Sequence, residues 1–528
     1  MSTSDYIIVG AGSAGCVLAC RLIERGFSVT LLEAGPRDWR LDFRIHMPAA
    51  LSHVLSGTSY NWNYTSEPES GLNDRRIFCP RGRTLGGSSS INGMVYVRGH
   101  RSDFDRWAEL SGYDDWRFEA CAPYFVRAED APFGDPSVRG IGGPLHISRG
   151  NVSTPLVKAF LQAGQQAGHT YSNDLNGVAQ EGVGPFDKTT WQGQRWSTSR
   201  AYLDRVRTSS RLSLKTGCTV RRVFIEAGQA RGVEVDIRGN TERLYAEREV
   251  ILCAGAINSP QILMLSGIGD GDELASLGIP VVQHLQGVGK NLQDHLEVYV
   301  QRSCKRPVSI YPLLRWYNQA WVGLAWYLLK RGPGATNHFE AGGFIRSDDS
   351  VAYPDLQMHF LPIAMNYDGS ETVDHHGFQV HVGPMKPTSR GAVSLVSNDP
   401  YRAPRILFNY ASTETDRRVM RNGIAKVREI LRQPAFADLA GEELVPAPDV
   451  CSDEDIDRFV SARGESAYHP CGTCRMGQDD NAVVDNGGRV HGIAGLRVVD
   501  ASIMPEITNG NLNAPVIMLA EKIAAAID

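Results

Sequence analysis

Two short apolar runs, with a helix-like pattern between them, open the chain. Residues 6–9 are apolar and rich in β-branched side chains, which is typical of a buried strand, and residues 29–32 form a second such run. Between them Val17, Leu18, Leu22 and Ile23 recur on one helical face, and Gly26 is placed to end that helix. The pattern therefore predicts a strand, a helix and a second strand at the start of the chain.

The turn after the first strand carries the spacing G-x-G-x-x-G. Gly10 permits a tight turn, Gly12 lets backbone N–H groups approach a pyrophosphate, and Gly15 lets the helix pack closely on the strand. The helix N-terminus favours phosphate, and Glu33 after the second strand is suited to an adenosine ribose. The whole context predicts a dinucleotide site, with FAD and NAD both open. Its predicted contacts are Gly10, Gly12, Ser13, Ala14, Gly15, Glu33 and Ala34.

Later apolar runs divide the chain into two kinds of structure. Residues 212–214, 220–225, 232–237 and 249–253 read as strands, and the last returns to the opening sheet. Ser259 and Pro260 are expected to open a helix there, since proline suits a first turn. Between about 300 and 464, alternating runs such as 379–382 and 392–395 indicate antiparallel strands, and 416–431 indicates an amphipathic helix.

These patterns predict an α/β fold with an α+β second domain. A chain of 528 residues is too long for one core. We expect a Rossmann-like dinucleotide-binding domain from residues 1–154, 199–300 and 465–528. A discontinuous substrate domain, built on an antiparallel sheet, is expected from residues 155–198 and 301–464.

Composition narrows the class of protein. The net charge is −5 with no long basic run, which argues against nucleic-acid binding. The ten cysteines are scattered, so a reduced compartment is favoured over a disulfide framework. The first strand begins near residue 5, which leaves no room for a signal peptide. We therefore expect a cytoplasmic protein without a transmembrane segment, with peripheral contact on the inner face of the membrane as an open alternative.

The segment 313–331 is rich in Trp and Tyr and is bounded by Arg315, Lys330 and Arg331. It is too short to span a bilayer. Two interpretations remain: a helix that covers the active site or is buried in the second domain, which we prefer, or a helix that lies on a membrane surface.

Two further stretches carry candidate chemistry. Residues 86–94 hold three glycines and three serines beside apolar neighbours, which predicts an interior loop with N–H groups around a phosphate or a planar ring. Near the end, His469 precedes a proline, a position more often taken by a capped loop histidine. Cys471 and Cys474 form a C-x-x-C, but no second pair at ligand spacing supports a metal site.

Together these stretches resemble the glucose–methanol–choline oxidoreductases over essentially the whole chain. The matching segments are 10–15 with Glu33, 82–93, 255–269, 287–295, 468–477 and 498–522. Residues 337–346, 360–364 and 469–476 look closest to the choline-dehydrogenase-like alcohol dehydrogenases.

The resemblance implies FAD and the oxidation of an alcohol to an aldehyde or ketone by hydride transfer to flavin N5. It implies that His469 takes the hydroxyl proton and that Asn511 holds the oxygen. Some members tether FAD through a histidine at the position of Ile91, so we expect non-covalent FAD here. The further cofactor contacts that it implies are Gly86, Gly87, Asn92, Gly93, Met94, Val95, Val220, Ala254, Asp500 and Ala501.

The substrate and the electron acceptor stay open. Trp62, Glu340 and Tyr468 are candidates for a choline-type cation site, since a quaternary ammonium needs aromatic faces and a carboxylate. Neutral primary alcohols, polyols and sugars such as sorbose are the alternative substrates. A quinone or another acceptor besides O₂ is expected; an O₂-using oxidase and a non-redox hydroxynitrile lyase are the competing readings. An oligomer is possible.

Overall fold

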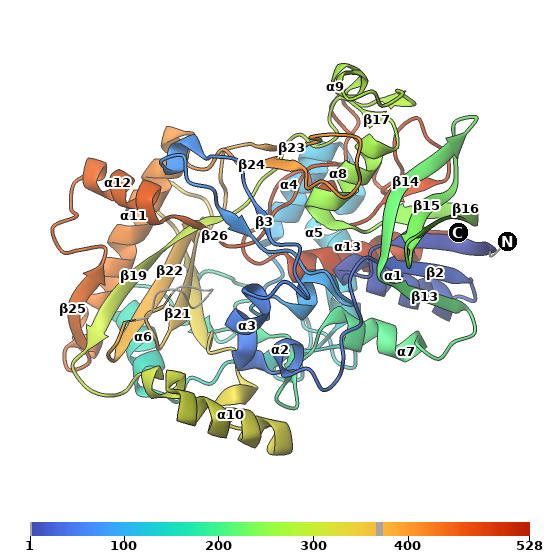
Figure 1. The fold of residues 1–528 in the computed structure, drawn as a ribbon. Coiled ribbons are helices and arrows are strands. Elements are labelled where there is room, and N and C mark those ends of the chain that lie inside the picture. The colour runs from blue at the N-terminus through green and yellow to red at the C-terminus, as the bar shows by residue number, and fades with distance from the viewer. Residues whose placement is uncertain (1–2, 366–372) are drawn as a thin grey trace.

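The computed structural model describes residues 3–365 and 373–528. Its first sheet has the strand order β13-β2-β1-β16, with β27 on the far side of β16, and these five strands run parallel. The hairpin β14–β15 extends β16 as an antiparallel ribbon. Figure 1 shows this sheet beside the two marked chain ends. The bounds are β1 (Thr3–Val9), β2 (Val29–Glu33), β13 (Leu212–Thr216), β14 (Cys218–Glu226), β15 (Gln229–Ile237), β16 (Asn240–Leu252) and β27 (Leu496–Val498).

Three helices join the start and the end of the chain on this sheet. Helix α1 (Ser13–Glu24) packs on the last helix, α13 (Asn513–Ala526), which packs in turn on α5 (Phe118–Ala128). Arg21 and Glu521 form a buried ion pair across the α1–α13 contact, at 2.7 Å. The predicted first unit is thus present, and its helix is sandwiched between the sheet and the C-terminal helix.

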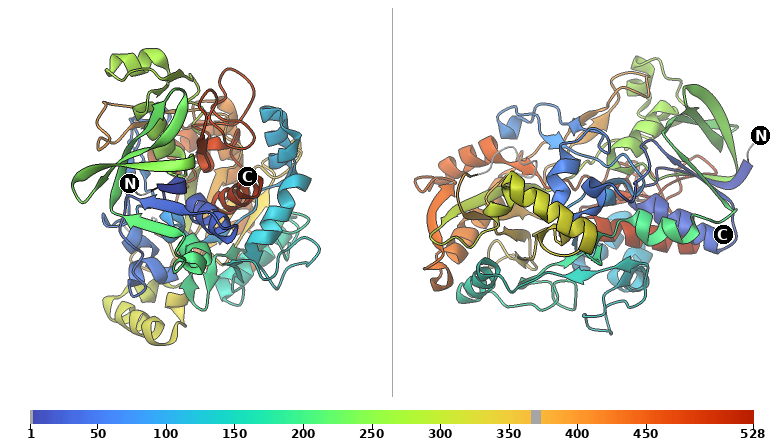
Figure 2. Two further views of the ribbon diagram at one scale, coloured as in Figure 1. Left: turned by 90° about the vertical axis from the view of Figure 1, so that its right-hand side faces the viewer. Right: turned by 60° about the horizontal axis from the view of Figure 1, so that its bottom comes forward.

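The second sheet is antiparallel, with the order β25-β19-β22-β21-β20-β9, and β26 also pairs with β19. Helices α6 (Pro155–Gln166) and α11 (Glu414–Leu431) cover it (Figure 2). Strand β19 spans residue 300, so the domain boundary predicted there falls inside a strand. The bounds are β9 (Gly182–Pro185), β19 (Leu296–Cys304), β20 (Ala341–Ile345), β21 (Leu356–Leu361), β22 (Gly377–Pro384), β25 (Ala440–Val445) and β26 (Glu465–Ser466).

The remaining helices and strands lie outside the two seven-stranded sheets. The further α-helices are α2 (Phe43–His46), α3 (Leu51–Leu55), α4 (Arg101–Ser111), α7 (Asp204–Val206), α8 (Gly255–Leu265), α9 (Gly271–Ser276), α10 (Trp316–Leu329) and α12 (Asp453–Arg463). The further strands are β3 (Tyr64–Thr65), β4 (Phe78–Cys79), β5 (Val95–Tyr96), β6 (Glu129–Asp130), β7 (Leu145–His146), β8 (Ser148–Arg149), β10 (Asp187–Lys188), β11 (Thr190–Trp191), β12 (Gln194–Arg195), β17 (Ile268–Gly269), β18 (Gln283–His284), β23 (Ala392–Ser394) and β24 (Arg405–Leu407).

Helix α8 starts earlier than the sequence predicted. It begins at Gly255, and Pro260 lies inside it rather than in its first turn. Proline has no N–H, so the carbonyl of Ala256, four residues earlier, loses its usual helical donor. The Thr473 hydroxyl donates to that carbonyl at 2.6 Å, which is why the proline is tolerated.

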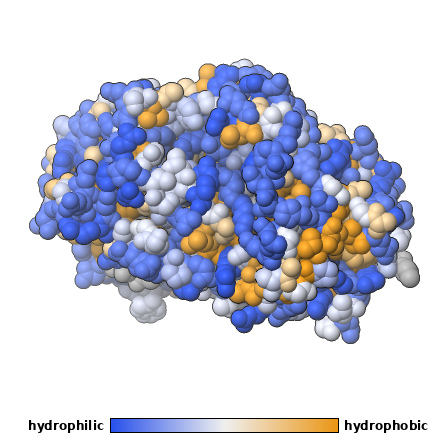
Figure 3. Space-filling view, turned by 90° about the horizontal axis from the view of Figure 1, so that it is seen from above, coloured by the Kyte–Doolittle hydropathy of each residue, from blue (hydrophilic) through white to orange (hydrophobic). Residues whose placement is uncertain are grey.

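Helix α10 is not buried in the second domain, which was one part of the interpretation that we preferred; that it covers the active site stays a prediction. It lies on the surface, at the bottom of Figure 1, and Trp326 is the one buried residue along it. The opposite face, seen from above in Figure 3, is mainly hydrophilic, with an apolar strip toward the lower right of the view. Among the residues that the structure describes, every helix is too short or too polar to cross a membrane.

Candidate functional site

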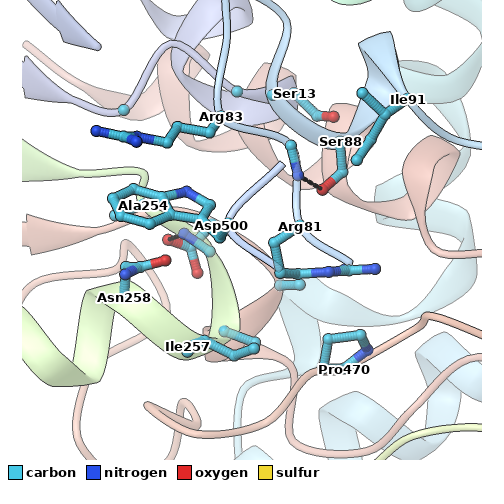
Figure 4. Close-up of a pocket in the computed structure, with 18 of the residues that line it drawn as sticks. Ser13, Arg81, Arg83, Ser88, Ile91, Ala254, Ile257, Asn258, Pro470 and Asp500 are labelled. Carbon is cyan, nitrogen blue, oxygen red and sulfur yellow. Dashed lines mark hydrogen bonds between the residues drawn. The ribbon is translucent and has the colours of Figure 1, made fainter. Parts of the chain in front are cut away.

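A cavity of about 530 Å³ runs from the carboxyl ends of β1 and β2 to the loop that carries His469. Strand ends of a parallel sheet are the usual place for a ligand in such a fold. Residues far apart in the chain, such as Ser13, Arg81, Ala254 and Pro470, line it together (Figure 4). The predicted residues that line it are Gly10, Gly12, Ser13, Ala14, Glu33, Ala34, Trp62, Gly87, Asn92, Gly93, Met94, Val95, Val220, Ala254, Tyr468, His469, Asp500, Ala501 and Asn511.

Three of the predicted site residues do not line the cavity: Gly15, Gly86 and Glu340. A Cβ on Gly15 would be 1.9 Å from the carbonyl oxygen of Gly10, so Gly15 serves the contact between helix and turn. Gly86 adopts a φ of 84° and donates its N–H to the carbonyl of Ala11, which joins the second loop to the first turn. Glu340 does not border the cavity.

The dinucleotide end of the cavity is built from backbone groups. Gly10 has a φ of 99°, and a Cβ there would be 2.5 Å from the carbonyl oxygen of Cys253. The residue before α1, Gly12, supplies no side-chain cap, so the first N–H groups of this helix are left for a ligand. The N-terminus of α13 is also uncapped by a side chain and borders the cavity, and Ser13 donates to Asn513 at 2.7 Å.

Two buried carboxylates hold the loops at this end. Glu33 accepts the N–H groups of Ala11 and Gly35 at 3.0 and 2.8 Å. Its burial raises the pKa to about 7. Asp500 accepts the N–H of Gly255 at 2.8 Å, and burial raises its pKa as well. The glycine-containing turn, the uncapped helix N-termini and the acid at the end of β2 fit the dinucleotide half of FAD.

At the other end of the cavity two histidines lie in contact. Nδ1 of His469 is 3.0 Å from Nδ1 of His295, and Nε2 of His295 is 3.1 Å from the carbonyl oxygen of Met385. A carbonyl only accepts, so Nε2 of His295 must carry a proton and, in the neutral ring, its Nδ1 must be an acceptor. His469 therefore carries its proton on Nδ1, and its Nε2 carries the lone pair.

The pKa shifts agree with two neutral rings. Burial lowers the pKa of His295 to about 3. Burial, followed by the neighbouring His295, lowers the pKa of His469 well below its usual value. At neutral pH the Nε2 atom of His469 is thus a base ready to take a proton.

Asn511 and two residues of β21 complete this end. Gln357 donates to Oδ1 of Asn511 at 3.1 Å, which directs Nδ2 of Asn511 toward Nε2 of His469, 3.0 Å away. His359 borders the cavity next to Asn511, and burial lowers its pKa to about 4. Asn511 can therefore donate to an oxygen at this place, and Nε2 of His469 can accept a proton there.

The His469 loop is anchored by Asp294, the residue before His295. Oδ1 of Asp294 accepts the backbone N–H of His469 at 2.6 Å, and its other oxygen accepts the hydroxyls of Tyr410 and Ser466. Tyr468 has a φ of 68°, a conformation that side chains other than glycine rarely adopt. Two consecutive residues thus fix both the backbone and the ring of His469.

Arg195 is a site residue that the sequence patterns do not predict. Its side chain is fully buried, and within the described parts of the chain it forms no ion pair with an acid; burial lowers its pKa to about 9. Its Nη1 donates to the carbonyl and to Oδ1 of Asn92, at 2.6 and 2.8 Å. A buried guanidinium thus holds the loop that lines the cavity.

The substrate candidates differ in their surroundings. Glu340 lies 2.7 Å from Nζ of Lys188, also accepts Thr336 and the N–H of Asn151, and does not border the cavity. Its charge is already matched, so this structure gives it an internal role instead of a cation site. Trp62 borders the cavity but stacks on Tyr64, with Arg83 over its ring at 4.8 Å.

Cys471 and Cys474 are buried and unbonded, and burial raises the pKa of both thiols, which favours packing over redox chemistry. Within residues 3–365 and 373–528 no cluster of ligand side chains suits a metal ion.

Comparison of the chain with known proteins points to one enzyme family. The GMC oxidoreductase family models match residues 4–297 and 387–520. Proteins called oxygen-dependent choline dehydrogenase are 51% identical in Chromohalobacter salexigens and 53% identical in Burkholderia pseudomallei, over 99% of this chain and 94% and 93% of theirs. A crystal structure of pyridoxine 4-oxidase from Mesorbium loti matches with a TM-score of 0.90 and 33% identity, covering 99% of this chain and 98% of that one.

The family assignment agrees with the geometry of the site. Family models cover most of the chain, and the relatives align from end to end. The cavity joins a dinucleotide-binding turn to a buried neutral histidine. The chain therefore belongs to the GMC oxidoreductases and is an FAD-dependent alcohol oxidoreductase.

Proposed function

We propose that the protein oxidises choline, or a closely related amino alcohol, at its hydroxyl group. The observation that carries this proposal is the identity of 51–53% to choline dehydrogenases over nearly the whole chain. FAD, when bound, supplies the acceptor for the hydride that leaves the alcohol carbon. The protein then has to activate the hydroxyl group, because an alcohol is a poor hydride donor until its O–H is polarised or deprotonated.

In this proposal Nε2 of His469 takes the hydroxyl proton. The Nδ1–H of the resulting imidazolium keeps its acceptor in His295, 3.0 Å away, and a general base of this kind contributes about 10²–10⁴-fold in rate. Asn511 holds the oxygen through its Nδ2–H, since its Oδ1 is engaged by Gln357. The uncapped N-terminus of α13 places partial positive charge at the cavity, where it favours negative charge on the cofactor or substrate.

Oxidation of neutral primary alcohols, polyols or sugars is the second candidate. Glu33 and Asp500 are the acids among the described residues that line the cavity, and both accept backbone N–H groups at the dinucleotide end. Glu340 is paired with Lys188. The absence of an unmatched carboxylate from the described lining favours an uncharged substrate, whereas the identity to choline dehydrogenases favours choline.

The electron acceptor is a separate question. The prediction of a quinone or another acceptor besides O₂ stays a prediction, and the name of the relatives, oxygen-dependent choline dehydrogenase, favours O₂ instead. A cytoplasmic location and an oligomeric state also remain predictions.

Anaerobic bleaching of the bound flavin tests the proposal. The holoprotein is mixed with choline, butanol, benzyl alcohol, glycerol or sorbose, and the loss of the yellow absorbance is followed. We expect choline to be fastest. If only neutral alcohols bleach the flavin, the mechanism stands and the substrate is that of the second candidate. If no alcohol bleaches it, a non-redox lyase becomes the favoured function.

Two additions to this experiment separate the remaining questions. Air and a quinone analogue, added to separate samples of reduced enzyme, show which reoxidises it faster. Glu340→Gln and Lys188→Met, made singly and together, test the cation site. If the pair is structural, the double variant keeps the ratio of choline to butanol rates; a selective loss of choline oxidation on Glu340→Gln would make Glu340 a substrate-binding residue.

A further inference from the structure

Helix α10 turns its apolar side outward. Tyr317, Trp321, Leu324 and Leu328 are spaced at i, i+4, i+7 and i+11, so they form one stripe along the helix. All four are exposed, and Trp321 and Leu328 reach 67% and 68%. Surface helices of globular proteins normally turn the apolar stripe toward the core and the polar one toward water.

The opposite side of α10 is firmly attached to the protein. Trp326 is 2% exposed, packs with Met47 and Ala50, and donates its indole N–H to the carbonyl of Gly193 at 2.7 Å. Trp326 therefore anchors the helix at the bottom of the molecule in Figure 1, and the stripe is exposed to solvent. Its 14 residues are too few to cross a bilayer, which takes about 20.

Along the segment that carries the stripe, the charged side chains are all basic. Residues 302–339 contain no Asp or Glu, although the chain as a whole carries a net charge of −5. Arg315 and Arg331 are exposed at the two ends of α10, and Lys330 lies 3.5 Å from the ring of Trp326. Trp and Tyr between basic ends are the side chains that sit well at the boundary between lipid headgroups and acyl chains.

We propose that α10 docks on the surface of an anionic lipid bilayer. Tyr317, Trp321, Leu324 and Leu328 insert at the level of the headgroups, and Arg315 and Arg331 meet anionic lipid. Charge complementarity favours this partner over a second copy of the chain, because two copies joined through this face would bring the same arginines together. The contact is independent of which alcohol the enzyme oxidises.

Co-sedimentation of the holoprotein with vesicles tests the proposal. One set contains equal parts of phosphatidylglycerol and phosphatidylcholine, and the other contains phosphatidylcholine alone. We expect binding to the anionic set, and a loss of about tenfold or more in affinity for Trp321→Ser/Leu328→Ser. Arg315→Glu/Arg331→Glu should abolish the preference for anionic vesicles. Ile141→Ser/Val178→Ser, which changes two exposed apolar residues elsewhere, is the matched control and should bind like the wild type.

Flavin content and anaerobic bleaching of each variant show that it is folded, because none of these residues borders the cavity. Light scattering without vesicles distinguishes the alternative partner. If the wild type is a dimer that Trp321→Ser/Leu328→Ser converts to a monomer, and neither binds vesicles, the stripe joins two copies and the proposal is overturned. Equal vesicle binding by the wild type and the stripe variant would overturn it as well.

Discussion

Nδ1 of His469 and Nδ1 of His295 lie 3.0 Å apart, so one of the two nitrogens must carry a proton and the other must accept it. The carbonyl of Met385 determines which nitrogen carries it. It accepts a hydrogen bond from Nε2 of His295, so the single ring proton of neutral His295 must be on Nε2. The proton between the rings consequently belongs to His469. A backbone carbonyl outside the cavity thus sets the lone pair that faces the substrate.

Replacing His295 should disturb this arrangement. In His295→Phe the buried Nδ1–H of His469 loses its acceptor, which costs about 1–3 kcal/mol and lets the other tautomer compete. We expect bound flavin to be retained and anaerobic reduction by the substrate to slow by about tenfold or more. Stopped-flow reduction measured across pH checks this, with the exposed His53→Phe as control. A rate and pH profile like the wild type would mean that His295 does not set the tautomer.

Removing the base itself should have a larger effect. His469→Ala is expected to keep the yellow flavin, because the dinucleotide end is untouched, and to slow anaerobic flavin reduction by at least about 10²-fold. His469→Gln keeps more of the volume and should be equally slow, since an amide cannot take the proton. Near-normal reduction of either variant would remove His469 from the role of base.

Mild acid should destabilise the fold. Burial lowers the pKa of His295 to about 3 and the pKa values of His46 and His359 to about 4. In the unfolded chain each of these rings binds a proton below about pH 6.5, whereas in the folded protein it stays neutral. Each histidine therefore lowers the free energy of unfolding by up to about 1.4 kcal/mol for every pH unit below that value. Glu33 opposes one of them, because its raised pKa of about 7 makes it stabilising at low pH and less so as pH rises through 7.

The net expectation is a melting temperature that falls as pH drops from about 6.5 to 5. Thermal unfolding of the holoprotein in buffers of constant ionic strength measures it. His295→Phe should flatten the slope, since one of the histidines that burial keeps neutral is gone. A melting temperature independent of pH over this range would show that these rings are not neutral in the fold.

Denaturation should release the flavin. Ile91 stands where some relatives attach FAD through a histidine, and its side chain is buried and unreactive. Acid precipitation is therefore expected to leave the pellet colourless and all of the flavin in solution. Colour in the pellet would reveal a covalent link at another residue.

Local patterns predicted the first sheet well. Residues 6–9 and 29–32 lie within β1 and β2, and the helix between them ends just before Gly26. These elements depend on neighbouring residues, so periodicity and turn residues were enough. The start of α8 was missed because a hydroxyl from Thr473, more than two hundred residues away, replaces the donor that Pro260 lacks.

The candidate site was also predicted only in part: single residues were found, but the contacts between distant segments were not. Family motifs located His469 and Asn511, and both border the cavity. The resemblance included the segment that contains His295, but not its contact with His469, which depends on how two distant segments meet. Glu340 was chosen for its charge; the pairing with Lys188 that neutralises it comes from a strand 152 positions earlier. Arg195 carried no local signal at all.

The ion pair between Arg21 and Glu521 joins residues 500 positions apart. The first strand, turn and helix therefore leave the ribosome long before the partner that covers them, a delay of about 25–100 s at about 5–20 residues per second. During synthesis one side of α1 stays uncovered until α13 has been made, and the cofactor cavity stays incomplete until then. Nascent chains stalled before residue 496 should accordingly be unable to retain FAD, however complete their second sheet is.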